Sequence, residues 1–96
     1  MRPSELLELH RERIREIVAE RGHSNIRVFG LVACGEDDEI SDIDFLVELG
    51  PHASLFDLSE LYYELSKLLG VEVDVLVDGA IPEILRDQVI EEAASV

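Results

Sequence analysis

The sequence has no tryptophan, one cysteine and three prolines in 96 residues. Because Cys34 stands alone, an internal disulfide is excluded, which agrees with a reducing compartment. No apolar run approaches the roughly 20 residues of a membrane-spanning helix. The first stretch, MRPSELLELHRERIRE, alternates charge too densely for a signal peptide. We therefore expect a single cytoplasmic domain over residues 1–96, with a modest aliphatic core and no membrane association.

Positive charge is scarce: 8 Lys and Arg face 22 Asp and Glu, for a formal net charge of -14. Such a surface repels phosphate backbones, which argues against nucleic acid as a direct ligand. A basic partner protein or a metal–nucleotide complex fits this charge better. The alternative is that the excess of acidic residues only keeps a small protein soluble.

The first third of the chain predicts a helix, a strand and a short helix. Residues 3–21 carry apolar positions at helical spacing, with Gly22 as the expected stop. NIRVFG, residues 25–30, is typical of a short strand that ends in a glycine turn. The LVAC that follows predicts one or two helical turns. The apolar positions of the first helix are Leu7, His10, Ile14, Ile17 and Val18.

The rest of the chain predicts two strands and two helices. Residues 43–49 and the alternating VEVDVLV of 71–77 read as strands. Between them, Ser54 and Asp57 have capping-box spacing ahead of a leucine-rich stripe that ends at Gly70. A last helix starts near Pro82. The two strands joined by a helix should be parallel neighbours, so we predict an α/β fold with a small mixed sheet of about three strands, in the order α-β-α-β-α-β-α.

Three aspartates indicate a metal site. Asp42 and Asp44 are two residues apart, so an extended backbone sends both carboxylates to one face. Asp74 lies on the polar face of the neighbouring strand, and a suitable register would bring it beside them. Three adjacent anions repel each other and have raised pKa values unless divalent cations hold them, which points to Mg²⁺. The alternative is that each is an ordinary turn or surface residue.

The stretch FGLVACGEDDEISDIDFLVEL, residues 29–49, resembles the signature of the minimal nucleotidyltransferases of the DNA polymerase beta superfamily. Their pattern is Gly-Ser, then Ala-Arg-Gly, then Ser-Asp-x-Asp before hydrophobic residues. VDVL around Asp74 matches the third family carboxylate, and SLFDLSELYYELSKLLG matches the intervening helix, so the resemblance covers nearly the whole chain.

The resemblance implies a polymerase beta palm-like fold and several functional assignments. Asp42, Asp44 and Asp74 would be catalytic metal ligands for two Mg²⁺ ions. ATP would be the nucleotide donor, received at Gly30 and Leu31. Members of this size act as antitoxins in a hetero-oligomer with a basic HEPN-domain toxin and can transfer AMP to its tyrosine. Asp74 would also help to deprotonate the attacking hydroxyl.

Two residues depart from the family pattern. Leu31 stands where the family has serine, and Cys34 where it has arginine. Leucine cannot donate a hydroxyl to a nucleotide phosphate, although the backbone N–H of residue 31 remains. Two functions follow from these residues. One is an Mg²⁺-dependent transfer of AMP onto the toxin. The other is a catalytically weakened antitoxin that neutralises a basic HEPN toxin, an RNase, by binding alone.

Other residues give weaker signals. The three histidines lie in separate segments without metal-ligand spacing, so we predict no histidine site. Cys34 is interpreted as a buried apolar residue rather than a reactive thiol. Residues 36–39 are interpreted as a solvated acidic loop. The helix after Ser54 carries more apolar side chains than a small core can bury, and some of them should face a partner.

Overall fold

Four strands form one mixed sheet in the computed structural model, which describes all residues 1–96. Their spatial order is β3-β2-β1-β4; β2 and β3 are parallel, and β1 is antiparallel to both β2 and β4. The elements are α1 (Pro3–Leu9), α2 (Arg11–Glu20), β1 (Ser24–Phe29), α3 (Gly30–Cys34), β2 (Ile43–Glu48), α4 (Leu55–Leu69), β3 (Val73–Val77), the 3-10 turn η1 (Asp78–Ala80), α5 (Glu83–Glu92) and β4 (Ala94–Ser95). The predicted α/β class and the parallel β2–β3 pair are confirmed.

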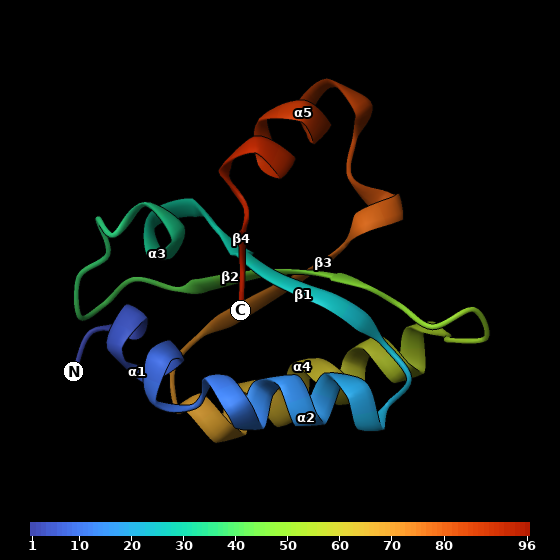
Figure 1. Cartoon of the computed structure of the whole chain (residues 1–96), viewed down its shortest axis with the longest axis horizontal. Coiled ribbons are helices and arrows are strands. Elements are labelled where there is room, and N and C mark those ends of the chain that lie inside the picture. The colour runs from blue at the N-terminus through green and yellow to red at the C-terminus, as the bar shows by residue number, and fades with distance from the viewer.

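The two faces of the sheet are covered differently (Figure 1). Helices α2 and α4 lie along one face, whereas α3 and α5 lie on the other. Because side chains alternate along a strand, Ile43, Phe45 and Val47 all enter the core shared with α2 and α4, each with no exposed surface. Asp44 and Leu46 therefore project toward the face that α3 and α5 cover.

Helix α4 begins and ends as its sequence predicts. The Ser54 hydroxyl accepts the Phe56 N–H at 3.2 Å, and the Asp57 carboxylate accepts the Ser54 N–H at 2.7 Å, which completes a capping box. Gly70 ends the helix with a φ of 68°, a left-handed conformation that glycine adopts without strain. Leu61, Leu65 and Leu69 recur at helical spacing and are buried. This cap and this stripe hold the core-facing side of α4 against the sheet.

The predicted single helix over residues 3–21 is two helices. The chain leaves helical geometry at His10, where φ is -105° and ψ is 12°. The break lets α1 lie beside α3, while α2 continues under the sheet (Figure 1). Apolar spacing alone could not reveal the break, because Leu7 and Ile14 keep the same period on both sides of it.

The estimate of about three strands is one short. Ala94 and Ser95 form β4 and pair with Val28 and Arg27. The Val96 N–H donates to Ile26 O at 3.1 Å. A two-residue strand shows no alternation, so the sequence carries no signal for it. No helix in the structure combines the length and apolar character needed to span a membrane.

Truncating the core side of α4 should destabilise the protein. Leu61 has no exposed surface, so Leu61→Ala should cost about 2–5 kcal/mol of unfolding free energy through lost burial and the cavity left behind. Leu55→Ala, in the same helix but 81% exposed, should change it by less than about 0.5 kcal/mol. Urea unfolding measures both. Similar losses in the two variants would contradict the assigned core face.

Candidate functional site

Asp44 and Asp74 lie opposite each other on adjacent strands. Their Cα atoms are partners in the parallel β2–β3 register, and on the other side Asp44 pairs with Phe29, the last residue of β1. Asp42 is exposed just before β2 begins. The sheet therefore brings together two of the three predicted carboxylates directly, and the third lies two residues away along the chain.

The charge of this carboxylate pair is not compensated by any side chain. None of the eight ion pairs in the structure involves Asp42, Asp44 or Asp74. Partial burial raises the pKa of Asp44 first, and the negative charges of Asp74 and then Asp42 raise it further. No three His, Cys, Asp or Glu side chains are grouped closely enough to hold one metal ion together. The structure thus shows an uncompensated pair with a third carboxylate within electrostatic reach.

Gly30, the first residue of α3, lies close to the Asp44 carboxylate. Its φ is 72°, which places the turn from β1 into α3 in the left-handed region. A Cβ at this position would lie 2.7 Å from Asp44 Oδ2. Only glycine therefore lets the turn backbone pass this close to the Asp44 carboxylate.

The two departures from the family pattern are both on the surface of α3. Leu31 is 50% exposed. Cys34 is also exposed, so its interpretation as a buried residue is wrong. Its Sγ donates to Gly30 O at 3.1 Å, one helical turn back, so the hydrogen bond of the thiol is made within α3. A five-residue helix has too little inward surface to bury every apolar side chain it carries.

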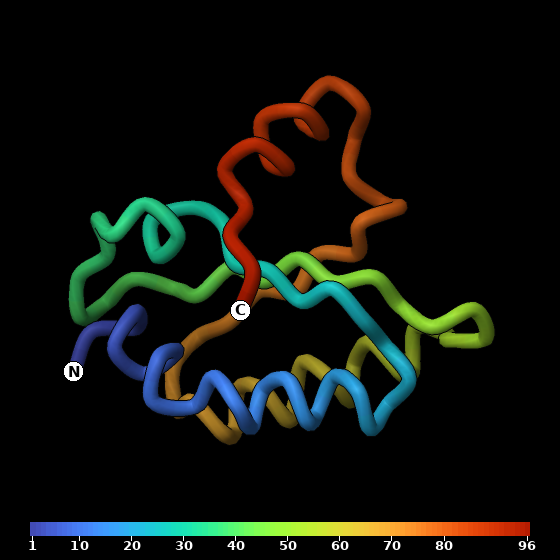
Figure 2. The backbone as a smooth tube through the Cα atoms, viewed as in Figure 1, coloured from blue at the N-terminus to red at the C-terminus, as the bar shows by residue number.

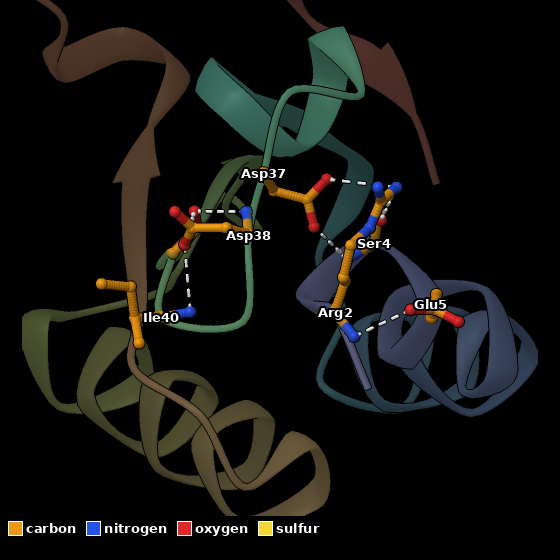
Figure 3. Close-up of polar contacts among 7 residues, drawn as sticks. Arg2, Ser4, Glu5, Asp37, Asp38 and Ile40 are labelled. Carbon is orange, nitrogen blue, oxygen red and sulfur yellow. Dashed lines mark hydrogen bonds and ion pairs between the residues drawn. The ribbon is translucent and has the colours of Figure 1, made fainter.

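The acidic loop before Asp42 is not wholly solvated, because Asp37 is buried. Its Oδ2 accepts the Ser4 N–H at 2.9 Å, and its Oδ1 lies 3.8 Å from Arg2 (Figure 3). Burial raises the pKa of Asp37, but the hydrogen bonds from Ser4 and the charge of Arg2 outweigh it, and the net pKa is below the ordinary value. Asp37 thus fixes the loop to the start of α1. No local sequence signal links residues 33 positions apart, so sequence reasoning missed it.

A second contact orders the end of the same loop. Asp38 Oδ1 accepts the Ile40 N–H at 3.1 Å and the Ser41 hydroxyl at 3.0 Å (Figure 3). The Ser41 oxygen accepts the Asp38 N–H at 2.9 Å. These bonds form an Asx-type turn. The turn delivers the chain to Asp42 in a defined direction.

Comparison with known proteins gives one family. The model of the nucleotidyltransferase domain family matches residues 11–95. MJ0435 of Methanocaldococcus jannaschii, named as a candidate protein adenylyltransferase, is 43% identical over 90% of this chain and 92% of its own. The protein adenylyltransferase MntA of Thermococcus cleftensis is 33% identical over 95% of this chain and 89% of its own.

Solved structures show the same fold. A structure described as a candidate minimal nucleotidyltransferase is similar with a TM-score of 0.87 and 39% identity, covering 97% of this chain and 95% of that chain. One chain in a structure of a tri-AMPylated Shewanella oneidensis HEPN toxin in complex with an MNT antitoxin is similar with a TM-score of 0.70 at 20% identity, covering 92% of this chain and 69% of that chain. At that identity the second likeness shows the fold alone.

Adding a methyl group at Gly30 should destabilise the protein more than adding one at Gly35. Both glycines have left-handed φ values, 72° and 74°, so Gly30→Ala and Gly35→Ala share a backbone cost of about 1–2 kcal/mol. Nothing lies within 4 Å of a Cβ at Gly35, whereas one at Gly30 meets Asp44. Urea unfolding should show an extra loss for Gly30→Ala that disappears when Asp44 is also changed to Ala. An equal loss in the two single variants would show that the turn does not press on Asp44.

Proposed function

Because the chain belongs to the nucleotidyltransferase domain family, we propose that it is an Mg²⁺-dependent enzyme that transfers AMP from ATP to a HEPN-type toxin and acts as its antitoxin. The observation that carries the proposal is the Asp44–Asp74 pair, two adjacent carboxylates on neighbouring strands with no protein cation beside them. Ordinary surface aspartates disperse or pair with Lys or Arg. An uncompensated pair behind a glycine turn suits a site that takes its positive charge from a ligand.

The acceptor is proposed from the relatives. The similar T. cleftensis protein is named a protein adenylyltransferase, and the similar S. oneidensis antitoxin is in complex with a HEPN toxin that carries AMP. Another structure with this fold is a toxin–antitoxin complex with AMP-PNP. The net charge of -14 supports a basic partner for this chain, since opposite charges favour encounter.

The carboxylates fit a hard divalent cation. Asp42, Asp44 and Asp74 offer only oxygen donors, and the pKa of Asp44 is raised by partial burial and further by the charges of Asp74 and Asp42. Bound there, Mg²⁺ would neutralise that charge and the charge developing on the departing pyrophosphate.

The protein's own residues have three tasks in the proposed reaction. Asp74 accepts the proton of the attacking hydroxyl. Gly30 lets the turn backbone lie against Asp44, so that the N–H of residue 31 can contact a phosphate oxygen. Asp37 holds the loop that leads to Asp42. Orientation of the triphosphate is a large part of catalysis in this kind of transfer.

A second function is favoured by α3 itself. Leu31 is exposed where the family has a serine. Where the family has an arginine, the Cys34 thiol donates a hydrogen bond to Gly30 O. Losing one charge-assisted hydrogen bond costs about 1.5–3 kcal/mol. A chain that lacks both contacts would transfer AMP slowly and would neutralise the toxin mainly by binding it.

One experiment separates the two functions. The purified chain is incubated with α-labelled ATP, Mg²⁺ and a HEPN-type toxin. Label on the partner, lost with Asp44→Asn, is expected for the enzyme. A complex that inhibits the toxin without any label would establish the binding function and overturn the transfer.

Divalent cation should stabilise the protein through the carboxylates. Millimolar Mg²⁺ should raise the Tm of the wild type, because a ligand that binds only the native state stabilises it. Asp44→Asn should lose most of this shift, whereas Asp87→Asn, an exposed aspartate on α5, should keep it. Scanning calorimetry measures all three proteins. Equal shifts throughout would show that the cation acts on general surface charge.

Restoring the family residues on α3 should speed the transfer. Leu31→Ser returns a hydroxyl and Cys34→Arg returns a positive charge for the triphosphate. The double change should raise the rate of AMP transfer about ten- to a thousandfold, the effect of one or two charge-assisted contacts in the transition state. Rates are measured with labelled ATP.

The control for this gain is the same pair of changes with Asp42→Asn and Asp44→Asn, which should remain inactive. An unchanged rate in the double variant, while the aspartates still matter, would show that the α3 turn does not hold the phosphates.

A further inference from the structure

Helix α5 crosses the face of the sheet that carries Asp44 and Asp74. The chain leaves β3 at one edge, and after α5 it returns as β4 at the opposite edge. It must therefore pass over β2 and β1, and Figure 2 shows this path as a strap between the end of β3 and the C-terminus. Alternation along the strands places Arg27, Asp44, Leu46 and Asp74 on the side that α5 covers.

Helix α5, the middle of this strap, has little apolar anchorage, although Ile81 before it and Val96 at the C-terminus are buried. No residue of α5 is buried, and Ile84, Leu85 and Ile90 are all exposed. Helices α2 and α4 each bury three residues. Burial of apolar side chains is the main source of helix attachment in a small domain, so α5 depends more on other contacts than the helices of the opposite layer do.

One carboxylate provides the polar attachment. Asp78, which follows β3, accepts Arg27 of β1 at 2.5 Å through Oδ2 and Arg86 of α5 at 2.7 Å through Oδ1. Arg86 also donates to Asp78 O at 2.7 Å. No other side-chain hydrogen bond or ion pair joins α5 to the rest of the chain. Arg27 and Asp78 are 12% and 14% exposed at their side chains, so solvent screens their pair only weakly.

We propose that Asp78 is a positioning residue for nucleotide binding: by joining Arg27 and Arg86 it holds α5 over the face that carries Asp44 and Asp74, and α5 forms one wall of the nucleotide site. The proposal rests on the proposed function. It assigns a task to a carboxylate that contacts neither metal nor nucleotide, and to a helix that the core does not need.

The charges on this face favour the same assignment. Of the 8 Lys and Arg residues, only Arg27 and Arg86 belong to the sheet or to the helices above it; the others belong to α1, α2, α4 or the residues that flank them. Asp78 neutralises part of their charge and fixes both guanidinium groups. With both ion pairs to Asp78 formed, the two arginines supply the only fixed positive charge on the face that would receive a triphosphate.

The test compares Asp78→Asn with the wild type in two measurements. Hydrogen exchange of residues 83–92, followed by mass spectrometry, should speed up at least about tenfold when the ion pairs of Asp78 are lost, while exchange of α4 stays unchanged. Titration calorimetry with Mg²⁺ and AMP-PNP should show a Kd about three- to thirtyfold higher, as expected for the loss of a charge-assisted pair that positions a ligand. Arg86→Gln should behave alike, and Arg86→Lys should recover part of the affinity.

Glu64→Gln is the matched control. It removes the ion pair of Glu64 with Arg21 between α2 and α4, so it perturbs stability without touching α5. It should leave both the α5 exchange and the Kd unchanged. A rise in Kd with Glu64→Gln equal to that with Asp78→Asn would reduce Asp78 to a general stabilising residue.

Two further outcomes would overturn the proposal, and they differ in scope. If the wild type binds AMP-PNP and Asp78→Asn binds it equally well, α5 is not a wall of the nucleotide site, and the proposed function stands. If the wild type binds no nucleotide with Mg²⁺, the proposed function itself fails and the assignment of Asp78 fails with it.

Discussion

The parallel register between β2 and β3 is the constraint on which the candidate site depends. It places Asp44 opposite Asp74 and at the same time places Ile43 opposite Val73 and Phe45 opposite Val75. A slip of one residue would turn Asp74 into the core and Val73 out of it. Burial of the apolar partners therefore holds two like charges side by side. Burial and this repulsion raise the pKa of Asp44, and the packing of the apolar core offsets their cost.

This alternation also divides the molecule into two layers with different means of attachment. Below the sheet, α2 and α4 are held by buried leucine, isoleucine and valine side chains. Above it, α5 is tied to the sheet by a single carboxylate, Asp78, which joins Arg86 of the helix to Arg27 of β1. The lower layer is held by many buried apolar side chains, whereas the attachment of α5 is lost with one substitution. Changes in the upper layer can therefore alter the site with little effect on the core.

The sequence was sufficient wherever a feature is local or periodic. Capping at Ser54, the stop at Gly70 and the alternation around Asp44 and Asp74 each depend on residues a few positions apart, and the structure has them. Features that depend on distant residues were missed. Asp37 is buried because Ser4 lies against it, and β4 exists because β1 presents a free edge. Neither fact is visible in the local pattern of residues 36–39 or 94–95. Asp42, Asp44 and Asp74 as metal ligands stay predictions, supported by the pairing of the last two.

Acid should act on Asp44 in the opposite direction to Asp37 and Asp78. The folded-state pKa of Asp78 is lowered first by the hydrogen bond from Arg27 and then by that from Arg86, so its stabilisation is present above the unfolded value of about 3.9 and is lost as pH falls through the lower folded value. The pKa of Asp37 is also lowered in the folded state, so its stabilisation is lost in acid in the same way. Asp44 behaves in the opposite way. Its pKa is raised in the folded state, so the folded state binds the proton more tightly, and the repulsion between Asp44 and its neighbouring carboxylates is relieved as pH falls. As pH falls, Asp44 therefore takes up its proton before Asp37 and Asp78 take up theirs. The site would lose the charge of Asp44 while Asp37 and Asp78 still hold the loop and α5.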